Sequence, residues 1–422
     1  MTKKSLTFVF SLINGILIVF LSVLPAKASI TIPGADGSDG TLQITRSTVI
    51  DLSEAVTGDW DADNSENSGK GIYDPQKWAV VFKYASISID TGATLSFSNH
   101  QSRAPVVWLV NGNVTINGTV SLDGQGYQEP PKNAEPGPGG FRGGSGYFRT
   151  VERGAGFGIG GATNNKAYGQ SGSYGTGSIP YGNQSLIPLI GGSGGSGSNV
   201  SFSKKSGGAG GGAILIACQK TLTVNGIIQS NGGSGHIYSS NHSSGGGSGG
   251  AIRLVADTLA GSGKIYAMGG NGGMDSGGMG LIRIEMVHND DTLEPPVPGA
   301  STITLTSATT ALLWPPDNAP KVKILSIGNK NAPDDPRSSF GTYGADVALP
   351  EVSSTQVVVE TTNVEEASQV LVRVTPRFNN NYAVINATVE RVVTEDPLVI
   401  RWIADLPVNV GYSAVQVKVL RP

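Results

Sequence analysis

The sequence predicts an all-β protein, in which a parallel β-helix with long glycine-rich insertions is followed by an immunoglobulin-like β-sandwich. Three observations lead to this prediction. Asn-Gly and Asp-Gly pairs return every six residues between short alternating apolar runs. Glycine is concentrated in the middle of the chain, where residues 125–280 hold 45 of the 61 glycines. Beyond a Pro-rich stretch, seven short β-branched runs follow one another without a long helical pattern.

The chain begins with the features of a secretory leader. Two lysines precede an apolar run over residues 6–24, and the run ends in Ala26-Lys27-Ala28, which has the small residues of a cleavage site. We therefore predict a signal peptide over residues 1–28. The alternative is an uncleaved membrane anchor, because the apolar run is almost long enough to cross a bilayer. Later segments are less apolar, so we expect no membrane span after cleavage, and a protein secreted by a bacterium or held on its surface.

The β-helix prediction rests on regularly spaced corners. The pairs Asn111-Gly112, Asn117-Gly118 and Asp123-Gly124 are separated by short apolar runs. Asn, Asp and Gly enter left-handed backbone conformations at low cost, so each pair predicts a turn of the chain. Short strands joined by equal corners predict coils, and each coil bonds to the next at a spacing of about 4.8 Å.

The same phrase recurs along the chain. Its strongest copies align Val114 with Leu222, Ile116 with Val224 and Val120 with Ile228, and weaker copies cover residues 87–95 and 259–269. We predict a β-helix of about six to eight coils over residues 29–288, interrupted by an insertion over residues 125–206. An antiparallel meander is the alternative, because Asn-Gly also forms hairpin turns. Strict six-residue spacing suggests left-handed coils, but the variable spacing and large insertions favour right-handed ones.

The composition changes again near residue 289. Residues 289–300 are polar and Pro-rich, so we predict a linker there. Residues 301–422 are predicted to form the sandwich, because short alternating runs separated by turn residues are typical of that fold. The runs cover residues 302–305, 321–327, 356–360, 369–375, 383–392, 398–402 and 414–420.

A family resemblance supports this organisation. Residues 102–110 read Ser-Arg-Ala-Pro-Val-Val-Trp-Leu-Val, and glycine runs precede Ala-Ile strands at Ala213-Ile214 and Ala251-Ile252. With the coil phrases, these features resemble bacterial exported glycine-rich parallel β-helix proteins, pectate-lyase-like or adhesin-like, mostly of unassigned function. The resemblance covers about residues 34–287. It implies the fold, but it carries no lyase motif.

The long insertion is the first candidate for ligand binding. It holds 22 glycines and many aromatic residues. Aromatic rings on a glycine-rich backbone offer flat faces on which sugar rings stack, and packing of these rings against the coils is the alternative. The candidate ligand-binding aromatics are Tyr127, Tyr147, Phe148, Tyr168, Tyr174 and Tyr181.

Calcium is a possible cofactor on sequence grounds. Asp59, Asp61 and Asp63 place oxygens at alternate positions, as calcium loops do. The twelfth position of that loop is Lys70, however, where such loops place a bidentate Glu. A solvated acidic loop is therefore the alternative. The single cysteine excludes a disulfide framework and any multi-cysteine metal site.

Two functions remain open. We expect a non-catalytic structural or adhesion protein that binds extracellular polysaccharide or other surface proteins; the alternative is a polysaccharide lyase or glycoside hydrolase on the β-helix. The net charge of −3, without a basic tract, argues against nucleic acid as a partner. Arg253 and Arg283 follow equivalent glycine runs and are predicted to stack, either as a ligand-binding ladder or as a solvated pair.

Overall fold

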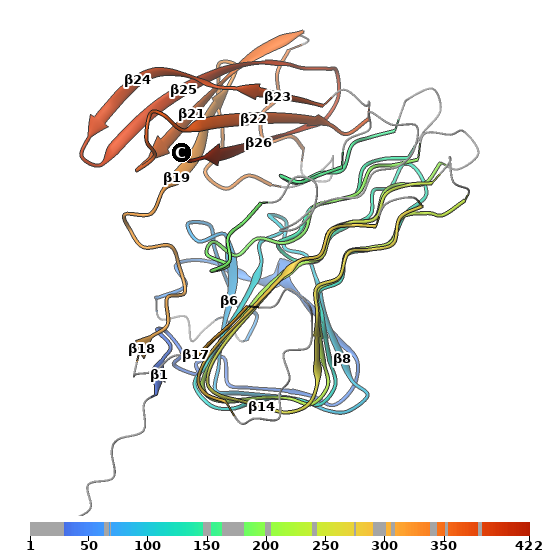
Figure 1. Ribbon diagram of the computed structural model, residues 1–422, viewed down its shortest axis with the longest axis vertical. Helices are drawn as coiled ribbons and strands as arrows, with labels where there is room; N and C mark the ends of the chain where they lie inside the picture. Colours follow the sequence, from blue (N-terminus) through green and yellow to red (C-terminus); the bar gives the residue numbers. More distant parts are fainter. Residues whose placement is uncertain are drawn as a thin grey trace, which may run out of the picture.

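The computed structural model is all-β, which confirms the predicted class. It describes residues 29–62, 67, 69–146, 153–162, 181–198, 204–238, 243–273, 276–289, 301–304, 309–337, 344–350, 353–378 and 382–422. The predicted leader and residues 290–300 of the predicted linker lie outside these ranges. In Figure 1 a stack of mostly parallel strands carries projecting glycine-rich segments, and two antiparallel C-terminal sheets lie above those segments.

The larger sheet of the first part has 11 strands. Its main path is β17 (Ser301–Thr304), β16 (Leu281–Asn289), β14 (Ala251–Ala260), β12 (Ala213–Val224), β9 (Val106–Val110), β6 (Ala79–Tyr84), β5 (Ile72–Asp74) and β4 (Val56–Thr57). Its branch contains β2 (Thr41–Ile44), β7 (Ser86–Ile89) and β10 (Val114–Ile116). The strands pair in parallel except β5 and β6, which are antiparallel, so the sheet is mixed.

A second sheet faces the first and has five strands, all in parallel. It runs β15 (Lys264–Tyr266), β13 (Ile227–Gln229), β11 (Thr119–Ser121), β8 (Thr94–Ser98) and β3 (Thr48–Asp51). Val120 lies opposite Ile228 here, and Val114 lies opposite Leu222 in the first sheet. These are positions that the sequence aligns, because the corners before and after each strand have equal spacing.

The main hydrophobic core lies between these two sheets. Alternate residues of β12, Ile214 and Ile216, turn toward it, and Val120 and Ile228 reach it from the second sheet. Trp108 is completely buried among them. Burying one Val, Leu or Ile side chain contributes about 1.5–3 kcal/mol, so this apolar interior accounts for much of the stability of the two facing sheets.

The outer face of the larger sheet is covered as well. Leu215 and Val255 point outward and pack against Ile30, Trp60 and Leu313. The short strands β1 (Ile30–Thr31) and β18 (Thr309–Thr310) pair in parallel over this face. The start of the described chain and a segment near residue 310 therefore shield the same apolar strip.

The glycine-rich segments form an ordered array outside the sheets. Their described residues form no strand, and their amides donate to neighbouring segments with a period of three residues. In residues 207–212 the donor-acceptor pairs are Gly207 to Gly144 and Gly210 to Phe141, Gly208 to Gly245 and Gly211 to Ser248, and Ala209 to Gln125 and Gly212 to Leu122. Successive residues therefore bond to three different neighbours, which is the pattern of packed polyproline-II helices with three residues per turn.

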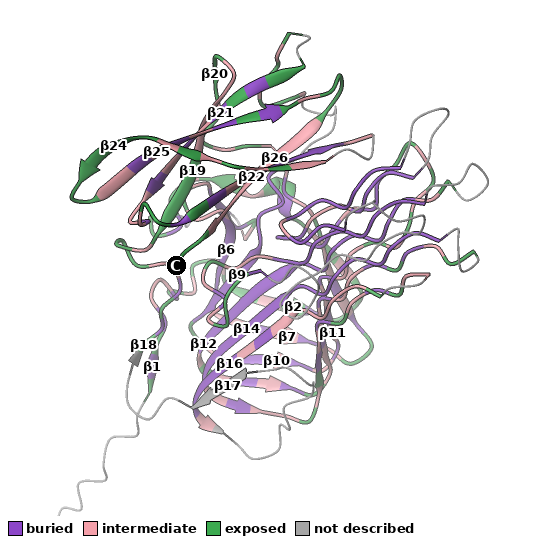
Figure 2. Cartoon of the chain, turned by 45° about the horizontal axis from the view of Figure 1, so that its top comes forward, coloured by how far each residue is buried: buried purple, intermediate pink, exposed green. Residues whose placement is uncertain are grey.

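Glycine is required in this array by the close approach of the neighbouring backbones. A Cβ built on Gly208 would lie 2.5 Å from the carbonyl carbon of Gly233, and one on Gly140 would lie 2.6 Å from the carbonyl oxygen of Gly211. Figure 2 shows that most of the residues in these segments are buried. The described part of the predicted insertion is thus closely packed backbone.

The C-terminal part consists of two antiparallel sheets. One contains β20 (Lys330–Asn331), β19 (Lys321–Ile327), β21 (Ser354–Thr362), β25 (Leu398–Pro407) and β24 (Thr388–Glu395). The other contains β23 (Ala383–Asn386), β22 (Gln369–Pro376) and β26 (Ser413–Leu420). Their facing sides bury a common core that includes Val359, Val372 and Trp402.

One predicted boundary needs correction. The first run assigned to the sandwich, residues 302–305, falls on β17, which pairs in parallel with β16 of the 11-stranded sheet. Thr302 lies opposite Ile284 in that pair. A single β-branched run has no feature that tells an added parallel strand from the first strand of a sandwich, so the sequence placed it on the wrong side of the boundary.

Candidate functional site

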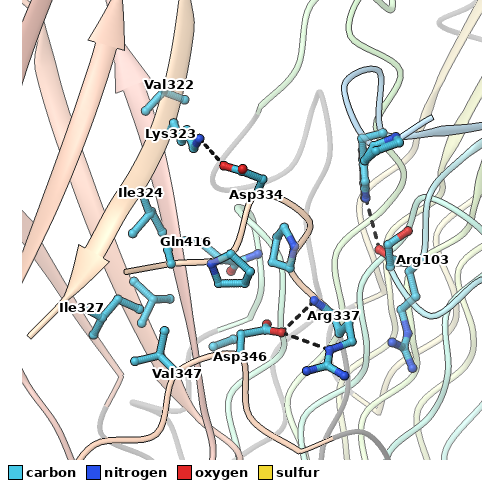
Figure 3. Close-up of a pocket in the computed structure, with 18 of the residues that line it drawn as sticks. Arg103, Val322, Lys323, Ile324, Ile327, Asp334, Arg337, Asp346, Val347 and Gln416 are labelled. Atoms are coloured by element: carbon cyan, nitrogen blue, oxygen red, sulfur yellow. Dashed lines mark hydrogen bonds and ion pairs between the residues drawn. The ribbon is translucent and has the colours of Figure 1, made fainter. Parts of the chain in front are cut away.

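A cavity of about 920 Å³ lies between the first part of the chain and the C-terminal sheets. One wall is formed by β19 and by residues 332–337 and 345–347, and the opposite wall includes Trp78, Arg103 and Phe141. Figure 3 shows Arg103 across the cavity from Lys323 and Asp334. We call this cavity the cleft. A concave site that combines rings with a few polar groups is the usual form of a ligand site.

Two strained turns place side chains at the cleft. Trp78 and Arg103 have positive φ angles of 48° and 54°, although neither is glycine. The Trp78 indole nitrogen donates to the Ser102 carbonyl oxygen at 3.1 Å, and the Arg103 amide donates to the His100 carbonyl at 2.9 Å. Such conformations cost about 1–3 kcal/mol each and occur preferentially at functional sites, where the surrounding structure holds them.

An ion cluster stands beside these turns. Glu135 accepts from Arg103 Nη2 at 2.6 Å and from Arg142 Nε at 2.6 Å, one arginine on each carboxylate oxygen. Both arginine side chains are mostly buried. Burial raises the pKa of Glu135, and the charge of Arg103 opposes that rise. Two cations share one anion here, so the cluster has a net positive charge.

The carboxylates on the opposite wall are all engaged in ion pairs. Asp334 pairs with Lys323, and Asp346 lies 3.7 Å from Arg337 Nε. Glu360 of β21 lies 3.4 Å from Arg401 of β25. These pairs leave the cleft lined by fixed charges and rings, an arrangement suited to hold a polar ligand.

A hydrogen-bonded joint lies beside the cleft, next to its lining residues Ser102 and Asp334. Tyr73 donates to Asp335 Oδ1 at 2.5 Å, and its ring stacks 4.0 Å from the ring of His100. His100 Nδ1 lies 2.8 Å from the Ser102 hydroxyl. Burial lowers the pKa of His100, so its ring is neutral near pH 7, and Asp335 opposes that shift. This joint ties the loop after β20 to β5 of the 11-stranded sheet.

A second joint is formed by Arg373 of β22. Its guanidinium donates to the carbonyl oxygens of Gly156 and Gly158 at 3.0 Å, and to that of Gly161 at 3.3 Å. The side chain is buried, and burial lowers the pKa of Arg373 to about 10, so it remains a cation at neutral pH. Arg373 therefore clamps the C-terminal sheet to the glycine array and holds the two walls of the cleft together.

Two of the six predicted ligand-binding aromatics, Tyr127 and Tyr181, belong to the described residues, and only Tyr127 is exposed. Tyr127 is 42% exposed and lies 4.8 Å from the ring of His236, next to Tyr238, which is 59% exposed. Tyr181 is buried, and its hydroxyl donates to the Gly191 carbonyl at 2.7 Å, so it packs inside the array and is unavailable to a ligand. The remaining four, Tyr147, Phe148, Tyr168 and Tyr174, lie outside the described residues.

Arg253 and Arg283, the two predicted ladder residues, lie on adjacent strands and share one carboxylate. Arg253 and Arg283 are register partners on β14 and β16, and both donate from Nε to Glu285 Oε1, at 2.8 and 2.7 Å. The side chain of Arg253 is 2% exposed and that of Arg283 is 16% exposed, so Arg253 is buried and Arg283 is only partly in contact with solvent. Burial by itself raises the pKa of Glu285, but hydrogen bonds and charge from Arg253 and Arg283 together lower it.

The predicted calcium ligands form no closed site in the described chain. Asp59 and Asp61 are exposed, and the Asp59 carboxylate accepts the Asp61 amide at 3.1 Å, which is a local turn. Asp63 lies outside the described residues. Within the described ranges, no group of three or more His, Cys, Asp or Glu residues is placed to hold a metal ion.

The sequence patterns did not predict the residues that line the cleft. Trp78, Arg103, Glu135 and Arg142 are separated along the chain and share no motif. The one available signal was the isolation of Arg103 and Arg142, two charges in apolar and glycine-rich surroundings. Such charges need a partner when buried, and Glu135 is that partner.

Comparison of the chain with protein-family models, with curated proteins and with solved structures gives no match. Among the described residues, no helix has the length and hydropathy needed to cross a bilayer.

Proposed function

We propose that this chain is an exported, non-catalytic bacterial protein that binds polysaccharide in the cleft. The observation that carries the proposal is the cleft itself, about 920 Å³ in volume, with rings and charged groups on both walls. Trp78 and Phe141 on one side and Tyr412 on the other offer faces for sugar rings, and the charged side chains offer hydrogen bonds to hydroxyl groups.

The scaffold in this proposal is a parallel β-helix followed by an immunoglobulin-like sandwich. The facing parallel sheets support the first assignment, because each aligned phrase contributes one strand to either sheet, as β10 and β11 do. The large insertions favour right-handed coils. The two C-terminal antiparallel sheets with a shared core support the second assignment. Export rests on the leader features of residues 1–28.

Binding is favoured over catalysis by the state of the acidic groups in the cleft. Asp334, Asp346 and Glu360 each pair with a cation. A general acid or nucleophile in a sugar-cleaving enzyme must be free to reach the glycosidic bond, and each of these carboxylates is bonded to a cation. The ion pairs therefore suit a wall that positions a polymer without cleaving it.

The test is affinity electrophoresis of the purified chain in gels that contain pectate, alginate, xylan or dextran. Tyr412→Ala should weaken retardation by at least one polymer about tenfold, because a stacking face is lost. Tyr238→Ala, an exposed ring outside the cleft, is the matched control. If Tyr238→Ala alone abolishes retardation, the binding site lies at the exposed rings of Tyr127 and Tyr238 and not in the cleft. Absence of retardation by every polymer, or release of unsaturated sugar ends, would refute the proposal.

A further inference from the structure

Three residues that line the cleft depend on one turn. Residues 100–103 connect β8 to β9, and Ser102 and Arg103 of this turn line the cleft together with Trp78. The Trp78 indole nitrogen donates to the Ser102 carbonyl oxygen at 3.1 Å, so the turn orients the Trp78 ring. Arg103 takes its φ angle of 54° within the same turn. A change in the turn would therefore move all three residues.

The turn is held from within by His100. Its carbonyl oxygen accepts the Arg103 amide at 2.9 Å, and its ring atom Nδ1 accepts the Ser102 amide at 3.3 Å. The Ser102 hydroxyl lies 2.8 Å from the same Nδ1. An amide N–H can only donate, so Nδ1 is the unprotonated ring nitrogen, and the hydroxyl donates to it as well. The neutral ring then carries its proton on Nε2.

The titratable groups around His100 come from three elements. Tyr73 of β5 stacks on the ring with centroids 4.0 Å apart, and Asp335 of the loop after β20 acts on it through its charge. In the turn itself, the charge of Arg103 is paired with Glu135. Burial lowers the pKa of His100, and Asp335 opposes that shift. Burial also raises the pKa of Tyr73, so its hydroxyl stays protonated.

A second proton on the ring is incompatible with the turn. It would sit on Nδ1 and would set a donor against the Ser102 amide, which is also a donor. His100 is 4% exposed and Ser102 is 3% exposed, so solvent does not relieve this contact. Either the turn opens or the ring swings toward Asp335, and both changes withdraw Nδ1 from Ser102.

We propose that His100 is a positioning residue of the cleft, and that it makes ligand binding depend on pH. The neutral ring holds Ser102 and Arg103 in place, and protonation of the ring releases them. Binding is therefore strong at neutral pH and weakens as the pH falls through the pKa of His100. The inference rests on the proposed function, since it concerns the site that holds the polymer.

Nitrogen-15 NMR of the histidine rings tests the switch on the purified chain without a ligand. At about pH 7.5 the His100 ring should be the tautomer protonated on Nε2. Its titration midpoint should lie below the ordinary histidine pKa of 6.5, and the amide signals of Ser102 and Arg103 should move with that midpoint. A ring protonated on Nδ1 at about pH 7.5, or amides that do not follow His100, would overturn the inference and leave the proposed function standing.

Calorimetric titration tests the link to binding. The probe is whichever of pectate, alginate, xylan and dextran binds the wild-type chain most tightly at about pH 7.5. His100→Asn keeps a side-chain oxygen that can accept the amide two residues on, and it takes up no proton in this range. It should match the wild type at about pH 7.5 and bind about threefold to tenfold more tightly than the wild type at about pH 4.5.

Two further variants complete the test. His100→Ala lacks the acceptor, so at about pH 7.5 it should bind more weakly than His100→Asn does. His236→Asn, at a histidine that does not line the cleft, is the matched control and should keep the pH dependence of the wild type. Equal affinities of the wild type and His100→Asn at both pH values would overturn this inference and leave the proposed function standing. Failure of every polymer to bind at about pH 7.5 would overturn both.

Discussion

Gly208→Ala tests whether the glycine array is a packed part of the fold. The added Cβ would lie 2.5 Å from the carbonyl carbon of Gly233 and closer still to its oxygen, whereas ordinary contact begins at 3.4 Å. The segment that contains Gly233 must therefore retreat by at least about 0.9 Å, the difference between 3.4 and 2.5 Å for the carbonyl carbon, and by more to clear the oxygen. Its amide now donates to the Ala209 carbonyl at 2.7 Å, and the retreat would stretch that bond to about 3.6 Å or more.

The cost follows from these displacements. A hydrogen bond of 3.6 Å is effectively broken, and a buried amide left without an acceptor costs about 1–3 kcal/mol. Overpacking adds about 1–3 kcal/mol. The lower entropy of the unfolded alanine chain returns about 0.4–1 kcal/mol. We expect Gly208→Ala to lower the free energy of unfolding by about 2–4 kcal/mol.

The assay is urea unfolding followed by circular dichroism and by tryptophan fluorescence. Gly126→Ala is the matched control in the same array, since a Cβ there would meet its nearest neighbour, the Ser234 carbonyl oxygen, at 3.4 Å. The control should stay within about 0.5 kcal/mol of the wild type. If the two substitutions have the same effect, the close backbone approach in the array is refuted, and with it the argument that glycine is required there.

Two further predictions concern buried arginines and their partners. Arg373→Ala should lower the free energy of unfolding by about 3 kcal/mol, because three glycine carbonyls lose a charged donor. Small-angle scattering should also show a larger radius of gyration for this variant. The control Arg391→Ala, on exposed β24, should change neither quantity. Glu285→Gln should cost about 3–5 kcal/mol at pH 7. Because the folded-state pKa of Glu285 is lowered, its stabilisation is complete above the ordinary glutamate pKa of 4.5 and is lost as pH falls through the folded-state pKa. The gap between wild type and variant should therefore narrow below pH 4.5 in acid titrations followed by fluorescence; a constant gap would contradict the ion-pair account.

The sequence predicted strand register better than it predicted packing. Val114 could be aligned with Leu222 because apolar alternation and Asn-Gly corners both depend on local backbone geometry. The array was not predicted, because a polyproline-II helix has no apolar periodicity and no internal hydrogen bonds. Its period was visible, however, in the non-glycine residues Ser193 and Ser196, three apart in a glycine run. The cleft could not be predicted from the sequence, since its walls come from distant parts of the chain that are joined through contacts such as that of Arg373 with the array.

The array also explains how a chain so rich in glycine can present a rigid site. Glycine loses more backbone entropy on folding than any other residue, and this cost is offset here because each segment bonds to several neighbours at once. At its edge, Gly156, Gly158 and Gly161 still offer carbonyl oxygens, and Arg373 takes all three. The C-terminal wall of the cleft is thus fixed to backbone carbonyls by Arg373, in addition to the side-chain joint between Tyr73 and Asp335. A cleft held in this way loses little entropy when it binds a ligand, and that preorganisation is what the weak single contacts of sugar recognition require.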